Sequence, residues 1–267
     1  AGQIATPKGA RERAVLKTAM ALERAERELD AALALARDAL AEAPGLVPAA
    51  ALAARLYGRR GDLKKGARIV EDVWREATHP DLADVYVDLR PGDSSLDRLE
   101  RARRLARLAP KSPDSAVAVA QAAIDAKEFA AARAALEPLL NDPDKRPSVR
   151  VAMTMAELEP ASGGPSGKVR EWYSRAARAP RDPAWIADGV ISDVWAPVSP
   201  GTGALDAFVW RTPDERLASP VDDPLDLFDE EPAAPAPALA APAPVVVPAE
   251  PAEVEAQARS RARAKWE

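Results

Sequence analysis

The chain has 267 residues, of which 47% are hydrophobic, 30% charged and 4% aromatic. It has no cysteine, which excludes disulfides, thiolate nucleophiles and cysteine metal sites. The net charge of −5, with no basic stripe among aromatic residues, argues against nucleic acid as a partner. The alanine-rich, strand-poor composition predicts an all-α fold.

The first expected elements are two helices over residues 8–43, followed by a second pair over residues 46–79. In the second pair, apolar residues recur three and four positions apart, which is the period of amphipathic helices. Ala54 and Gly66 are small enough to let the two helix backbones approach closely. Because one such pair cannot bury its own apolar face, the pattern predicts further pairs beside it.

Three more helix pairs are expected over residues 81–110, 113–143 and 146–180. Ser94 or Ser95 is a suitable N-cap within the third pair. Helix-ending prolines recur at intervals of roughly 34 residues, the length of a tetratricopeptide (TPR) repeat. These prolines are Pro44, Pro80, Pro110, Pro143 and Pro180.

The chain therefore resembles a TPR-like helical-hairpin solenoid of about five pairs, assigned to residues 1–180. The anchoring aromatic residues of the TPR pattern are mostly replaced by alanine, so a generic alanine-rich array of helical hairpins is the alternative. A TPR solenoid binds helices or extended peptides on its concave surface. We expect Tyr57 and Tyr86 to be binding residues of this surface.

Residues 181–213 differ from the helical part in composition and pattern. The helical period stops, and short extended pieces containing Trp185, Trp195 and Trp210 alternate with turns. A solenoid needs a cover for its terminal repeat. We therefore expect Trp195 and Trp210 to pack as a Trp-rich cap on the last helix, beside Trp172. A recognition surface formed by the three tryptophans is the alternative.

Residues 214–267 are acidic and then rich in proline and alanine. Such a composition cannot bury enough apolar surface to offset the entropy of ordering. We expect this tail to be disordered. No run of residues is able to span a bilayer as a helix, because the longest uncharged stretch contains several prolines.

The segment from Ile191 to Trp210, following alanine-rich TPR-like pairs, resembles the C-terminal end of the HemY family. Members of that family are TPR proteins of the bacterial inner membrane associated with haem biosynthesis. The resemblance implies protein partners among the late haem-biosynthetic enzymes. It also implies anchoring at the inner membrane by a segment preceding Ala1, with the repeats on the cytoplasmic side.

Related TPR proteins can end in a zinc ribbon with two C-x-x-C knuckles. Here Ala187, Val190, Ser199 and Thr202 stand at knuckle-like spacings, and these residues provide no thiolate for zinc. The resemblance thus implies a metal-free relic of such a ribbon.

Catalytic chemistry has little support in the sequence. His79 is the single histidine, and its position before Pro80 favours helix capping or a surface position over ligation of haem iron. The glycine-rich segment at residues 163–167 lacks the G-K-[ST] ending of a P-loop, so it is interpreted as a flexible loop.

We therefore expect a non-catalytic scaffold without a cofactor. The alternatives are a carrier of haem or porphyrin, and an assembly adaptor unrelated to haem.

Overall fold

The computed structural model describes residues 6–213, and the tail expected to be disordered lies outside them. Within this range the chain forms ten α-helices and three short β-strands. The helices are α1 (Pro7–Arg24), α2 (Leu29–Glu42), α3 (Val47–Arg60), α4 (Leu63–Glu76), α5 (Pro80–Val87), α6 (Ser95–Ala106), α7 (Pro113–Asp125), α8 (Phe129–Leu140), α9 (Val149–Ala161) and α10 (Ser166–Ala177). The strands are β1 (Ala184–Ala187), β2 (Val190–Ser192) and β3 (Val209–Arg211).

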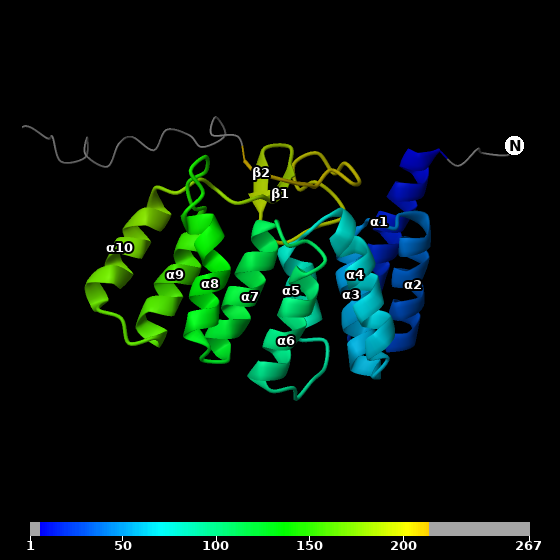
Figure 1. Cartoon of the computed structure of the whole chain (residues 1–267). Coiled ribbons are helices and arrows are strands. Elements are labelled where there is room, and N and C mark those ends of the chain that lie inside the picture. The colour runs from blue at the N-terminus through cyan, green and yellow to red at the C-terminus, as the bar shows by residue number, and fades with distance from the viewer. Residues whose placement is uncertain (1–5, 214–267) are drawn as a thin grey trace, which may run out of the picture. The chain divides into compact units, whose positions relative to one another are not determined.

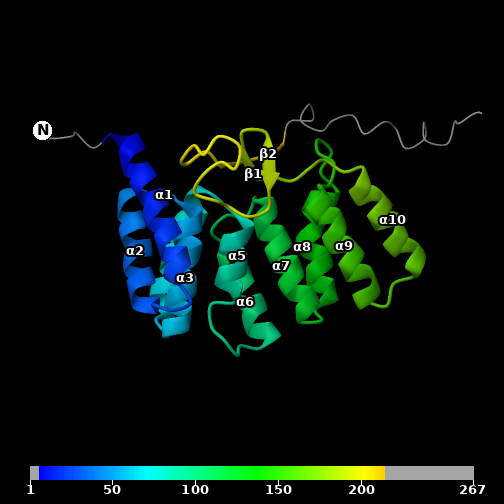
Figure 2. The same cartoon turned by 180° about the vertical axis from the view of Figure 1, so that it is seen from behind.

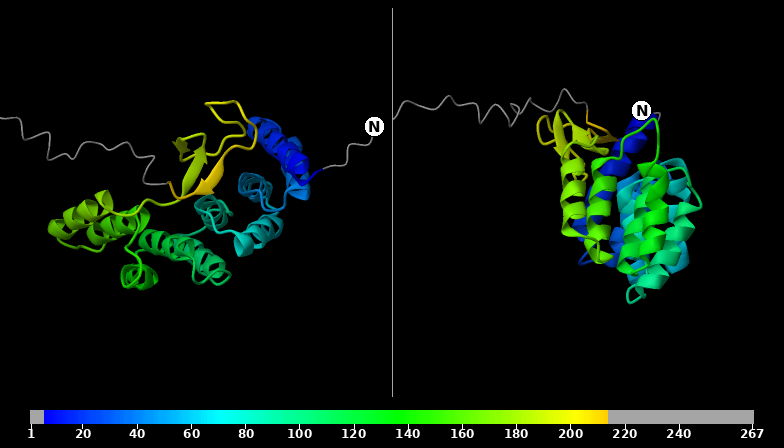
Figure 3. Two further views of the ribbon diagram at one scale, coloured as in Figure 1. Left: turned by 90° about the horizontal axis from the view of Figure 1, so that it is seen from above. Right: turned by 60° about the vertical axis from the view of Figure 1, so that its left-hand side comes forward.

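Consecutive helices form five hairpins, from α1–α2 to α9–α10, which confirms the predicted number and order of pairs (Figure 1). The first helices of successive pairs also contact each other, so α1, α3, α5, α7 and α9 form a continuous row. Seen along the helices, the pairs follow an arc whose hollow side contains the strands (Figure 3). The helical part is therefore a repeat-like array.

The helices begin where the sequence places capping residues. The hydroxyl of Ser94 accepts a hydrogen bond from the Asp97 amide, and the Asp97 carboxylate accepts one from the Ser94 amide, which forms a complete capping box. Ser112 and Ser148 cap α7 and α9 through their hydroxyls. The N-cap predicted at Ser94 is confirmed.

Two glycines allow close packing in the α3–α4 hairpin and its neighbour. A Cβ atom at Gly66 would lie 3.0 Å from the Ala54 carbonyl oxygen and 3.2 Å from the Cβ of Tyr57. A Cβ at Gly58 would lie 2.5 Å from the carbonyl oxygen of Leu89, which follows α5. The predicted close approach at Ala54 and Gly66 is therefore present, and Gly58 provides a second one.

The strands form an antiparallel sheet in the order β2-β1-β3, in which Trp185 pairs with Trp210. We call residues 184–211 the ribbon. Asp188 and Gly189 both adopt positive φ angles in the β1–β2 turn, as the two-residue hairpin turn requires. Extended pieces are confirmed at Trp185 and Trp210, whereas Trp195 lies outside the strands.

The ribbon does not cover the last helix pair. Trp185, Trp195 and Phe208 belong to the same buried cluster as residues of α1, α3, α4 and α5, such as Val15 and Leu82. The strands lie above the ends of α5 and α7, and the ribbon loops extend toward α1 (Figures 1 and 2).

The predicted cap on α10 is therefore wrong in its location. Trp172 of α10 packs in a separate cluster with residues of α6 to α9. Tyr173, its neighbour on that helix, is 49% exposed. The ribbon tryptophans instead complete the apolar cluster of the first helix pairs, which includes Val15, Val47 and Leu82.

Candidate functional site

The ribbon meets the helices at an aromatic cluster formed by His79, Trp185 and Trp210. The His79 ring centroid lies 4.0 Å from that of Trp210 and 5.3 Å from that of Trp185. The two indoles are 5.3 Å apart and tilted by 60°. These are tilted aromatic contacts, which stabilise a packed junction. Two of the tryptophans predicted as site residues are thus brought together, with a histidine from a distant repeat.

His79 is the N-cap of α5, and its Nδ1 accepts a hydrogen bond of 3.1 Å from the Asp81 amide. The acceptor role of Nδ1 places the proton of the neutral ring on Nε2. Within the described residues, this buried Nε2 has no hydrogen-bond partner. Burial lowers the pKa of His79, although the carboxylates of Asp81 and Asp114 oppose the shift.

The predicted capping role of His79 is confirmed, but the surface position is wrong. The residue is 1% exposed because the ribbon covers it. Haem iron would reach Nε2 only after the ribbon had moved away. The aromatic cluster therefore has the properties of a structural junction.

A chain of polar contacts beside this cluster links three repeats to the start of the ribbon. The Thr78 hydroxyl lies 2.8 Å from that of Ser112 and donates a 2.7 Å hydrogen bond to Asp114. The guanidinium of Arg150 donates to the same Asp114 carboxylate. The backbone amide of Arg150 donates to Asp182 at 2.6 Å. The starts of α5, α7 and α9 are thus tied to Asp182, two residues before the ribbon.

The two knuckle-like turns of the ribbon lie against each other. The Thr202 hydroxyl donates a 2.5 Å hydrogen bond to Asp188, and the Ser199 hydroxyl accepts from the amides of Gly201 and Thr202. Hydrogen bonds from Ser199 and Thr202 lower the pKa of Asp188. Among residues 6–213, no group of three or more His, Cys, Asp or Glu side chains is able to hold a metal ion.

The other three predicted site residues, Tyr57, Tyr86 and Trp195, are core residues. Tyr57 is 6% exposed and packs with α1 and α2, and Tyr86 is 1% exposed. The Tyr86 hydroxyl donates a 2.5 Å hydrogen bond to Glu71. Burial, and then this hydrogen bond, raise the pKa of Tyr86 far above its ordinary value. Neither tyrosine offers a ring to a partner on the concave surface, and Trp195 is likewise buried, with 8% exposure.

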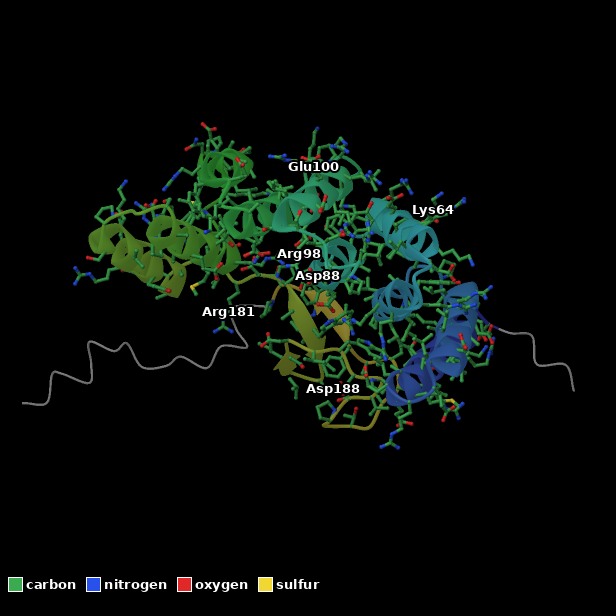
Figure 4. All side chains as sticks on the ribbon, turned by 90° about the horizontal axis from the view of Figure 1, so that it is seen from below. Lys64, Asp88, Arg98, Glu100, Arg181 and Asp188 are labelled. Atoms are coloured by element: carbon green, nitrogen blue, oxygen red, sulfur yellow. The ribbon has the colours of Figure 1, made fainter. Side chains whose placement is uncertain are left out.

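An open hollow of about 330 Å³ lies between α5, α7 and α9, and we call it the inner groove. Four exposed carboxylates line it, from Asp84, Asp88, Asp125 and Glu157. Arg98 is the basic residue of its lining, and its Nε lies 3.2 Å from an Asp88 oxygen. Asp88 and Arg98 lie on the hollow side of the arc, and Lys64 and Glu100 point outward (Figure 4).

The charge in the inner groove is incompletely balanced. The side chain of Asp84 reaches solvent but is partly desolvated by the groove walls. This desolvation, and then the like charges of Asp81 and Asp88, raise the pKa of Asp84. A cation placed beside Asp84 would relieve this repulsion. The groove therefore has the charge and the shape to accept basic side chains.

The inner groove was not predicted from the sequence. The signal for it is the spacing of Asp81, Asp84 and Asp88 at positions i, i+3 and i+7, which places them on one side of α5 and its C-cap. Asp125 and Glu157 come from other repeats, so their proximity depends on how the repeats stack.

Comparison with known proteins gives a distant similarity. No family model matches the chain. A curated protein of Magnetospirillum gryphiswaldense named "Probable magnetosome protein Mms48" is 26% identical over 212 residues, which is 79% of this chain and 47% of that protein. The chain thus spans about half the length of this relative. The name assigns the relative to the magnetosome and mentions no haem biosynthesis.

No helix within residues 6–213 combines the length and the apolar character needed to cross a membrane.

Proposed function

We propose that the chain is a non-catalytic scaffold of divergent TPR-like repeats, and that its inner groove holds a basic segment of a protein partner. The observation behind the proposal is the row of carboxylates along α5, α7 and α9, at the place where a helical-repeat array binds its ligands. An acidic groove selects a basic partner by charge and accelerates its association.

The resemblance of residues 191–210 to the HemY family suggests that the partners are late haem-biosynthetic enzymes at the inner membrane. In this proposal the ribbon is a structural element rather than a binding surface. Its tryptophans contribute to the core of the first three helix pairs, and none of them lines the inner groove.

An adaptor role unrelated to haem is the second candidate. The similarity to a protein named for the magnetosome supports it. The groove and its basic ligand would be the same in both cases, so the identity of the captured protein separates the two candidates.

Affinity capture from bacterial membranes tests the proposal, with the full chain as bait and mass spectrometry to identify the captured proteins. The groove variant is D84N/D125N. The matched control is D72N/E100Q, which removes two exposed carboxylates from α4 and α6 outside the groove lining. We expect wild type and control to capture a late haem-biosynthetic enzyme, and the groove variant to lose it.

Equal capture by all three chains would contradict groove binding. Groove-dependent capture of proteins unrelated to haem would select the adaptor role instead. Binding that weakens as salt is raised from 50 to 200 mM would support an electrostatic groove contact.

A further inference from the structure

A pocket of about 550 Å³, separate from the inner groove, lies between the end of α8, the following loop and α10. Its walls are largely apolar and include Leu140, Pro147 and Trp172. Three arginines, Arg146, Arg175 and Arg178, also line it. We call it the arginine pocket.

The charge of the arginine pocket is unbalanced. Of the described residues that line it, none has a carboxylate. Arg175 forms a 2.5 Å ion pair with Glu171 on the outside of α10. Arg178 donates to the hydroxyl of Ser174, and within residues 6–213 neither Arg146 nor Arg178 forms an ion pair. Two exposed guanidinium groups thus remain available for an anion.

The position of Trp172 indicates that the uncharged part of a ligand in this pocket would be apolar. The guanidinium of Arg175 lies 4.5 Å from the centroid of its ring, which is a cation–π contact. The indole is half-buried against the core of α6 to α9, so its position is held by packing. A ligand in the pocket would contact this fixed apolar wall while its charged end meets the arginines.

We propose that the arginine pocket binds a small amphipathic organic anion, with an apolar body and one carboxylate or sulfonate group. A volume of this size suits a drug-sized molecule, and inorganic phosphate would leave the apolar walls uncovered. The planar guanidinium forms paired hydrogen bonds with carboxylate-like groups. The site is independent of the proposed scaffold function.

The competing explanation is that the arginines only stabilise the C-terminal end of α10. Basic residues near a helix C-terminus interact favourably with its free carbonyl groups. This explanation applies to Arg175 and Arg178. It does not apply to Arg146, which lies on the loop before α9 and faces the same pocket.

The test uses the fluorescent anion 8-anilinonaphthalene-1-sulfonate and its uncharged analogue N-phenyl-1-naphthylamine, each titrated into the full folded chain. The variants are R146Q and R178Q. The matched control is R170Q, on an exposed arginine of α10 that does not line the pocket. Thermal unfolding of each variant shows whether it remains folded.

We expect the sulfonate to bind with one-to-one stoichiometry, and its affinity to fall about tenfold in R146Q and in R178Q but not in R170Q. The uncharged analogue should bind all four chains equally. The proposal is overturned if the sulfonate does not saturate, or if it binds R146Q as tightly as wild type. A lower melting temperature in R178Q together with unchanged binding would leave helix stabilisation as the role of the arginines.

Discussion

The ring of His79 packs 4.0 Å, centroid to centroid, from the indole of Trp210, and so joins the start of α5 to the last strand of the ribbon. The same histidine caps α5 through Nδ1. One side chain therefore stabilises a helix start and a contact between distant parts of the chain.

Replacing His79 separates these two contributions. H79A removes the cap and the ring contacts, and should lower the free energy of unfolding by about 2–3 kcal/mol. H79N retains a capping side chain, so it should recover roughly 1 kcal/mol of that loss. Urea unfolding followed by circular dichroism gives both values. Equal losses in the two variants would show that the cap makes no contribution.

The stability of the chain should fall as the pH is lowered below about 6.5. Burial lowers the pKa of His79 in the folded chain, so between 6.5 and that lowered value the unfolded chain binds a proton that the folded chain does not. Protonation then favours unfolding, and stability is recovered as the pH rises again. Because His79 is the single histidine, H79N should lose this pH dependence between pH 6.5 and 5. An unchanged slope in H79N would assign the effect to carboxylates.

Removing the ribbon should destabilise the first three helix pairs rather than the last. A chain ending at Asp182 lacks the ribbon but retains the hydrogen bond from the Arg150 amide. Its control is a chain ending at Pro213, which lacks only the tail. Hydrogen exchange measured by mass spectrometry should show faster exchange in α1, α3 and α5, and unchanged exchange in α9 and α10. Faster exchange confined to α10 would restore the idea of a terminal cap.

Gly58 should tolerate no larger side chain, although alanine is the better helix former. In G58A the new methyl group would meet the Leu89 carbonyl oxygen at 2.5 Å, so α3 and the end of α5 must separate, at a cost of about 1–3 kcal/mol. The matched control is G167A in α10, where no atom lies within 4 Å of the new Cβ. That variant should be more stable than wild type by up to about 1 kcal/mol. Thermal unfolding of the two variants measures the contrast.

The ion pair between Arg11 and Asp206 should contribute little. The two side chains are 2.6 Å apart, but that of Arg11 is 48% exposed to solvent. D206N removes the charge and preserves a residue suited to the positive φ of 55° at this position. A double-mutant cycle with R11Q should give a coupling of at most about 1 kcal/mol, weaker in high salt. A larger coupling would make this pair a principal attachment of the ribbon.

The helices were predictable because their signals are local. The apolar period, the capping serines and the prolines of each repeat act within one or two turns, so the five hairpins follow from the sequence. The turn at Asp188-Gly189 is also a local hairpin signal, and it marks the β1–β2 connection.

The position of the ribbon and the inner groove were not predictable in the same way. Nothing near Trp195 or Trp210 in the sequence specifies which helices they contact, and the general need of solenoids for a terminal cover pointed to the wrong end. The groove carboxylates come from three helices, so they meet only once the repeats are stacked. Tyr57 and Tyr86 were predicted as binding residues of the concave surface, but both rings are buried in a core that has few other large side chains.

Because the ribbon packs on helices that precede it by many residues, the core of the first helix pairs is completed only late in the synthesis of the chain. The pairs from α1 to α6 leave the ribosome before the ribbon does, and they are able to begin folding while the ribbon is still being made. The apolar surface that later holds Trp185 and Phe208 stays uncovered until residue 211 has emerged. A nascent chain stopped before residue 184 thus exposes a surface suited to chaperones, and closing it is a long-range, slow step in an otherwise local folding process.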